Sequence, residues 1–111
     1  MFTKSRIQQI TETIQIRNEF KEGLEQLMEK YNIQDSIFTT VNHQVREVTN
    51  GYFAVVKEFD NFNDAINECN ILTECIRIIN NDKFQIGVIS NSLSNCPENA
   101  KILDITQRTE Y

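Results

Sequence analysis

The segment His43-Gln-Val-Arg-Glu-Val-Thr-Asn-Gly-Tyr-Phe-Ala-Val-Val-Lys-Glu-Phe59 carries the strongest turn signal in the chain. Its central Asn50-Gly51 pair lies between two β-prone runs, and this dipeptide is preferred in type I′ hairpin turns because both positions require a positive φ. The sequence therefore predicts an antiparallel hairpin. Its facing pairs are Val48 with Phe53, Arg46 with Val55, Gln44 with Lys57, and His43 with Glu58.

Both faces of this predicted hairpin carry apolar side chains, because residues alternate between the two sides of a strand. One face holds Val48, Phe53 and Val55, and the other holds Val45 and Val56. A sheet that is apolar on both sides needs cover on both sides, either from helices of its own chain or from a second copy.

Apolar residues at three- and four-residue steps predict a first helix from Lys4 to Tyr31, with a stripe that shifts sideways between Ile14 and Ile16. At 1.5 Å per residue this helix would measure ~40 Å, whereas a compact chain of this length has a radius of gyration of ~13 Å. Part of the helix must therefore overhang, bend near Gly23 or pack against another subunit. It is either a core helix with one buried stripe or a dimerisation helix.

The second predicted helix begins at Asp60 or Asn61 and ends at residues 80–82. Its apolar stripe is Phe62, Ala65, Ile66, Cys69, Leu72, Ile76 and Ile79. Residues 37–48, 84–90 and 101–106 have the composition of strands, so residues 52–90 read as a strand, helix, strand unit. The expected fold is one α+β domain over residues 1–111, with a long N-terminal helix, an antiparallel hairpin, an amphipathic crossover helix and one or two C-terminal strands, forming a four-stranded sheet covered by helices.

The net charge of −5 and the pI near 4.8 argue against direct binding of nucleic acid or of an anionic membrane surface. No apolar run approaches the ~20 residues of a membrane-spanning helix. The three cysteines, Cys69, Cys75 and Cys96, are an odd number without paired spacing, and the chain does not open with a signal-peptide pattern. These features favour reduced thiols in a cytoplasm. Abundant Ile and Asn with few Gly indicate an AT-rich genome, such as that of a low-GC bacterium or its phage.

Several chemistries are excluded by residue counts and spacing. Three glycines cannot build a phosphate-cradling loop or a dinucleotide fingerprint, and no CxxC or HExxH spacing indicates a metal site. A dyad of Cys96 and His43 would need a base in contact with the thiol and an anion-stabilising site, and the sequence indicates neither. We therefore expect no enzymatic activity, cofactor or metal. The predicted contact of His43 with Glu58 is either a simple cross-strand pair or a pH-sensitive base.

Two surfaces are candidate binding sites. Asp60, Asp64 and Glu68 recur at four-residue steps and predict an acidic ridge on the second helix, which is either a solvated face or a docking surface for a basic protein. Arg46 and Lys57 are predicted to be diagonal neighbours on the hairpin. Together with Phe53 and Arg108 they form either a site for a small anion or surface salt bridges.

Two functions follow from these surfaces. The first is a non-enzymatic, homodimeric protein-interaction module, such as an inhibitor or regulator of the kind that a phage or mobile element carries, acting through the acidic ridge. The second is a small-ligand binding protein that sequesters an anionic, nucleotide-like molecule at a homo-oligomer interface. The size and acidity of the chain favour the first.

Overall fold

The computed structural model describes residues 6–111, and within them the chain forms two α-helices, seven strands and one short 3-10 turn. The predicted helix residues Lys4 and Ser5 lie outside the described residues. In chain order the elements are α1 (Arg6–Lys30), β1 (Ser36–Val41), β2 (Gln44–Glu47), β3 (Tyr52–Phe59), α2 (Phe62–Glu68), β4 (Cys75–Asn80), β5 (Lys83–Ser90), η1 (Leu93–Asn95), β6 (Ile102–Asp104) and β7 (Thr109–Glu110).

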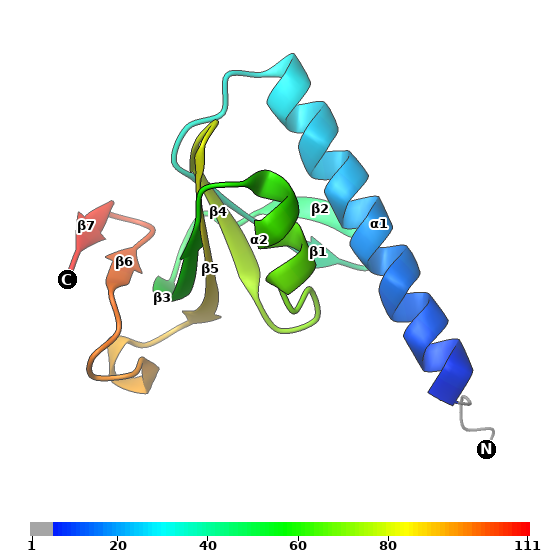
Figure 1. Cartoon of the computed structure of the whole chain (residues 1–111). Helices are drawn as coiled ribbons and strands as arrows, with labels where there is room; N and C mark the ends of the chain where they lie inside the picture. The colour runs from blue at the N-terminus through cyan, green and yellow to red at the C-terminus, as the bar shows by residue number, and fades with distance from the viewer. Residues whose placement is uncertain (1–5) are drawn as a thin grey trace.

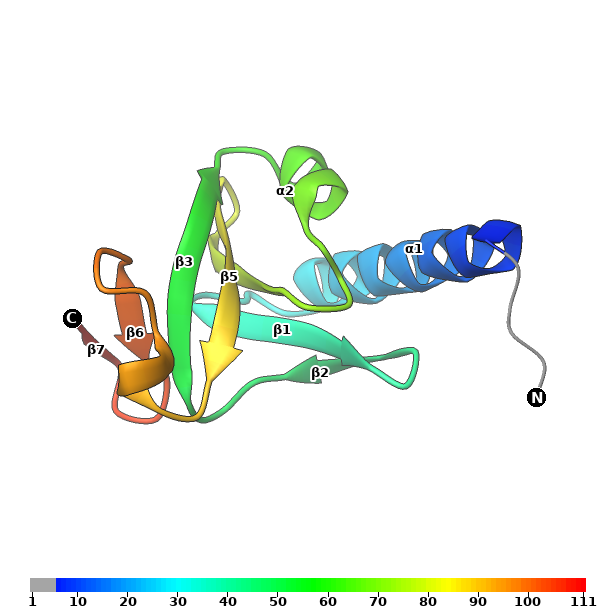
Figure 2. The ribbon, with the colours of Figure 1, turned by 90° about the horizontal axis from the view of Figure 1, so that it is seen from below.

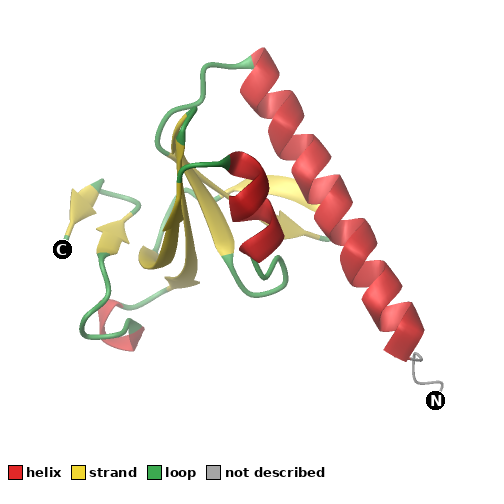
Figure 3. Ribbon diagram, in the orientation of Figure 1, coloured by secondary structure: helices red, strands yellow, loops and turns green. Residues whose placement is uncertain are grey.

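The seven strands form one antiparallel sheet in the order β2-β1-β4-β5-β3-β6-β7. The predicted α+β class is therefore confirmed, and the predicted four-stranded sheet is wrong. Both helices lie on one side of the central strands, while β6 and β7 lie on the other (Figures 1 and 3).

The predicted hairpin around Asn50-Gly51 is wrong, because β2 pairs with β1 and not with β3. Strands β1 and β2 form the hairpin instead, and Asn42 and His43 form its tight turn. Their φ angles of 51° and 63° satisfy the type I′ requirement. Gly51 has a φ of 102°, a conformation that suits glycine, but it lies in the segment that leads from β2 across the sheet to β3. The chain thus contains two turn signals, and Asn42-His43, the weaker of the two, closes the β1-β2 hairpin.

The second predicted helix is also wrong over its C-terminal half, because α2 ends at Glu68 and Cys75–Asn80 forms strand β4. Its start is confirmed, since the side chain of Asn61 accepts a hydrogen bond from the Asp64 amide at 3.2 Å. Asn70 then reverses the chain: its carbonyl accepts from the Glu74 amide at 2.7 Å, and its own amide donates to the Glu74 side chain at 2.7 Å. These local hydrogen bonds compete with continuation of the helix.

The insertion of β4 changes the topology of the predicted crossover. The sequence predicts a strand, helix, strand unit over residues 52–90, but a further strand, β4, follows the helix, and β3 and β5 are antiparallel neighbours with a bulge between Val55 and Lys57. Strands β3 and β4 both run antiparallel to β5, so α2 connects two parallel strands that have β5 between them.

The helix-covered face of the sheet holds the larger core, to which α1 contributes Phe20 and Leu24. The helix continues without interruption through Gly23, so the predicted bend there is not observed. Gly23 instead allows a close approach to β2, since a Cβ at this position would lie 2.4 Å from a methyl group of Val45. The sequence left three possibilities for this long helix, which were an overhang, a bend and packing against another subunit. The structure shows the overhang, because the N-terminal half of α1 runs past the edge of the sheet (Figure 1).

The other face of the sheet is concave and encloses a second core. Ile37 of β1, Phe53 of β3 and Leu103 of β6 belong to this core, although β1 and β6 are four positions apart in the sheet, about 19 Å if the sheet were flat. The sheet therefore curls, as seen from below in Figure 2. The hairpin for which two apolar faces were predicted does not form, but the sheet does carry apolar residues on both faces, with helices covering one face and the curled sheet the other.

Candidate functional site

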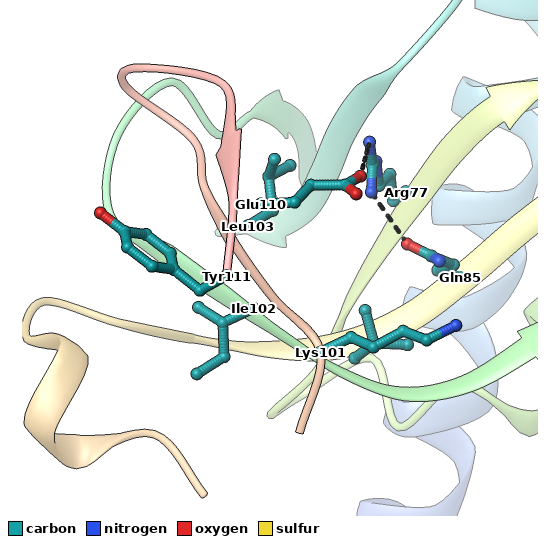
Figure 4. A pocket seen from close by; sticks show the side chains of 8 residues that line it. Arg77, Gln85, Lys101, Ile102, Leu103, Glu110 and Tyr111 are labelled. Carbon is teal, nitrogen blue, oxygen red and sulfur yellow. Dashed lines mark hydrogen bonds and ion pairs between the residues drawn. The ribbon is translucent and has the colours of Figure 1, made fainter. Parts of the chain in front are cut away.

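The concave face ends in a pocket of about 250 Å³ that combines a polar side with an apolar wall. Figure 4 shows the side chains that line it, which come from β3, β4, β5 and the C-terminal segment. They are Val55, Arg77, Gln85, Lys101, Ile102, Leu103, Glu110 and Tyr111.

Arg77 is the buried charge at the centre of this polar side, with only 8 % of its side chain exposed. Its Nε donates to Oδ1 of Asp35 at 2.6 Å, and its Nη2 forms an ion pair with the same oxygen. Its Nη1 donates to Oε1 of Gln85 at 3.1 Å. A buried guanidinium needs such partners because an unpaired charge is costly to remove from water.

The network continues from Gln85 across the sheet to Glu58. Gln85 Nε2 donates to Glu58 Oε1 at 2.9 Å, and Lys101 Nζ donates to the same oxygen at 3.2 Å. The hydrogen bond from Lys101, followed by that from Gln85, lowers the pKa of Glu58 below its ordinary value. The Glu58 carboxylate thus accepts from both Gln85 and Lys101 and links them at the edge of the pocket.

The C-terminal segment closes the outer side of the pocket. Glu110 Oε1 lies 3.9 Å from Nη2 of Arg77, and Arg108 Nη1 lies 3.7 Å from Oδ1 of Asp35. Asp35 and Arg108 both have a φ of 55°, in the left-handed region, so each is held at a turn. Figure 4 shows the Glu110 carboxylate and the Gln85 amide on two sides of the Arg77 guanidinium.

Sequence reasoning missed Arg77 because residues 75–80 were assigned to a helix, on which this arginine would face solvent. The signal that could have found it is the alternation in Cys-Ile-Arg-Ile-Ile-Asn: Ile76 and Ile78 point to the helix-covered core. Arg77 therefore points to the concave face.

The residues predicted for an anion site are not brought together. Arg46 lies on the edge strand β2 and donates to Gln44, whereas Lys57 lies on β3 with its ammonium 5.1 Å from the Phe59 ring centroid. Phe53 is fully buried in the concave core. Of the predicted set, Arg108 alone lies beside the polar network, through its contact with Asp35.

The three acidic residues of the predicted ridge are exposed. Asp64 and Glu68 lie one turn apart on α2, but Asp60 lies in the bend before the helix. Binding of a basic protein at these residues stays a prediction. The expected contact of His43 with Glu58 is wrong: His43 Nδ1 lies 3.0 Å from Oε2 of Glu19 on α1, so it ties the β1-β2 turn to the helix.

Two of the cysteines are buried and the third is partly exposed. Burial, with a smaller contribution from Glu74, raises the pKa of the Cys69 thiol to about 12, and burial also raises the pKa of Cys75. Cys96 Sγ contacts the carbonyl oxygen of Ser92. Across residues 6–111, no group of three or more His, Cys, Asp or Glu residues could hold a metal ion, and no helix is long and apolar enough to cross a membrane.

A second unusual surface lies on the overhanging half of α1. Ile7, Ile10 and Ile14 are 77 %, 51 % and 54 % exposed and follow one another at three- and four-residue steps. At 3.6 residues per turn they point about a quarter turn away from the packed residues Phe20 and Leu24. The sideways shift of the apolar stripe noted in the sequence marks the boundary between these two faces.

The fold and the pocket define an α+β protein with a curled antiparallel sheet. Comparison of the chain with known protein families, with curated proteins and with solved structures finds no match.

Proposed function

We propose that the protein is a non-enzymatic interaction module that forms a homodimer through the N-terminal half of α1. The observation that carries this proposal is the stripe of Ile7, Ile10 and Ile14 on a helix that extends beyond its own sheet. Such i, i+3, i+7 anchors are typical of helices that bury their apolar side against a partner, and water contact with three isoleucines is unfavourable.

A second copy of the chain fits this stripe because the stripe is nearly symmetric about Ile10. In an antiparallel helix pair Ile10 meets its counterpart, and Ile7 of one copy meets Ile14 of the other. Glu12, the charged residue between them, points about half a turn away from the stripe. The pairing therefore places apolar side chains against apolar side chains, and the surface is self-complementary, as an isologous contact requires.

The antiparallel orientation follows from where the rest of the protein lies. The sheet packs against the C-terminal half of α1, around Phe20 and Leu24. A parallel pair would bring both sheets to the same end, whereas an antiparallel pair keeps them apart. The contact area of two short helical segments falls below the ~1,200 Å² of a standard interface, so we expect a weak dimer that depends on concentration.

The non-enzymatic part of the proposal is supported by the contacts of the one pair that could have been catalytic. His43 binds Glu19 on α1, and Cys96 contacts a backbone carbonyl next to η1. Each side chain thus has a different partner, and a nucleophile needs its base in direct contact.

The test is sedimentation equilibrium of the wild type and of Ile10→Glu across a wide range of protein concentration. We expect the wild type to dimerise as its concentration rises and the variant to stay monomeric, because association would bury an unpaired carboxylate. The matched control is Val56→Glu on β3, which replaces an apolar residue that is 60 % exposed and lies outside the stripe, and which should leave the dimer intact. A wild type that stays monomeric throughout, or an Ile10→Glu variant that dimerises normally, refutes the proposal.

A further inference from the structure

We propose that the pocket beside Arg77 binds the carboxylate of a small molecule with a short apolar body, and that Glu110 is its built-in competitor. This site is separate from the stripe on α1 and does not depend on dimerisation.

The first observation is that Arg77 has spare hydrogen-bonding capacity. A guanidinium carries five N–H donors, and three of these are directed to Asp35 and Gln85. Arg77 also forms a long ion pair with Glu110, whose Oε1 lies 3.9 Å from Nη2, beyond hydrogen-bond distance. One N–H on each terminal nitrogen is thus left for a ligand, and two such donors match the two oxygens of a carboxylate.

The second observation is the mixed character of the pocket wall. Arg77, Gln85 and Lys101 lie on its polar side, whereas Val55, Ile102 and Leu103 form an apolar surface next to them. This arrangement suits an anionic head with a few carbon atoms attached. The volume of about 250 Å³ lies below the ~300–1,000 Å³ of pockets for drug-sized ligands. The site therefore favours a small carboxylate over a nucleotide.

The third observation is that the group nearest the free donors is weakly held. Glu110 lies on a strand of two exposed residues at the edge of the sheet, and 75 % of its side chain is exposed. The segment is fastened to β6 by pairing of Glu110 with Leu103 and of Thr109 with Asp104 and by a 2.8 Å hydrogen bond from the Tyr111 amide to Ile102, and Arg108 contacts Asp35 at 3.7 Å. Because the segment is short, exposed and at the edge of the sheet, it opens at lower free-energy cost than the central strands. An incoming carboxylate can thus replace the Glu110 carboxylate.

The test is a titration of the full chain with butyrate, followed by amide chemical shifts in two-dimensional NMR spectra. We expect saturable shifts at Arg77, Gln85, Ile102 and Leu103, and none with butyramide, which has the same shape without the charge. Because replacement of Arg77 would also remove its contacts with Asp35 and Gln85, the decisive variant is Glu110→Gln. We expect it to bind butyrate about two- to fivefold more tightly, as loss of one exposed ion-pair competitor predicts.

Two controls test whether the effect is specific to Glu110 and whether the bound carboxylate belongs to a small molecule or to a peptide. Glu98→Gln removes another exposed carboxylate, outside the pocket lining, and should leave butyrate affinity unchanged. A blocked Ala-Glu-Ala peptide that binds more tightly than butyrate would assign the site to peptide carboxylates and overturn the small-molecule proposal. Absence of saturable shifts in both the wild type and Glu110→Gln, or equal shifts with butyramide, would overturn it as well.

Discussion

Arg17 of α1 donates from Nη1 to the carbonyl oxygen of Ile66, at 2.7 Å, at the C-terminal end of α2. The same nitrogen lies 3.0 Å from the carbonyl oxygen of Asn67 and 2.9 Å from that of Cys69. These carbonyls belong to the last turn of α2, where intrahelical partners are missing. A side chain of the long helix thus caps the short one and fixes how they pack on the sheet.

The first prediction concerns this cap. Arg17→Met keeps the length of the side chain but removes the charged donor, and we expect it to lower the free energy of unfolding by about 1.5–3 kcal/mol. Urea denaturation measures this loss. Arg17→Lys, which retains a charged donor, should lose less, and equal stability of the Met variant and the wild type would show that the cap contributes nothing.

The second prediction compares two glycines. A Cβ on Gly87 would lie 2.2 Å from the carbonyl oxygen of Ala54 and 2.8 Å from the Phe53 ring, both inside the sheet. A Cβ on Gly23 would meet one methyl group of Val45, on an edge strand that can shift. We expect Gly87→Ala to destabilise the fold by about 1–3 kcal/mol. Gly23→Ala should cost less because it also gains ~1 kcal/mol of helix propensity. Thermal denaturation ranks the two variants, and the reverse order would contradict the packing described here.

The third prediction concerns alkaline pH. The pKa of Cys69 is raised from 9.0 to about 12 in the folded protein. Above pH 9 the unfolded chain therefore releases a proton that the folded protein keeps. The stabilisation is fully present below pH 9 and is lost as pH rises towards 12, by about 1.4 kcal/mol per pH unit.

Urea denaturation at about pH 8 and about pH 10.5 measures this alkaline loss. Because lysines and tyrosines also titrate there, the informative comparison is with Cys69→Ala, whose stability should fall less steeply between the two pH values. Parallel losses in the wild type and the variant would contradict a buried neutral thiol at this position.

The elements that could be predicted from sequence are those with one dominant pattern. The helix at 6–30, the cap at Asn61 and the strand at 83–90 each follow from local periodicity or capping chemistry. The errors arose where two local signals competed. Asn42-His43 and Asn50-Gly51 both suit tight turns, and pairing of β1 with β4 decides which turn closes a hairpin.

The candidate pocket could not be predicted because it depends on the curl of the sheet. Asp35 immediately precedes β1, the neighbour of the strand β4 that holds Arg77, but Glu110 reaches Arg77 from a strand four positions away. No regular spacing of residues in the sequence indicates the contact between Glu110 and Arg77. The isoleucines of α1 were visible as a pattern, but their exposure depends on where the sheet ends along the helix.

The antiparallel α1 pair is tested most directly by single cysteines in a Cys96→Ser background, in which the remaining native cysteines are buried. On mild oxidation Ile10→Cys should form an intermolecular disulfide, because the proposed pairing places the two copies of residue 10 opposite each other at the symmetry axis. Ile14→Cys and the exposed Gln26→Cys should stay unlinked. Absence of a linked dimer at position 10, or equal linking at positions 10 and 14, would contradict the antiparallel dimer.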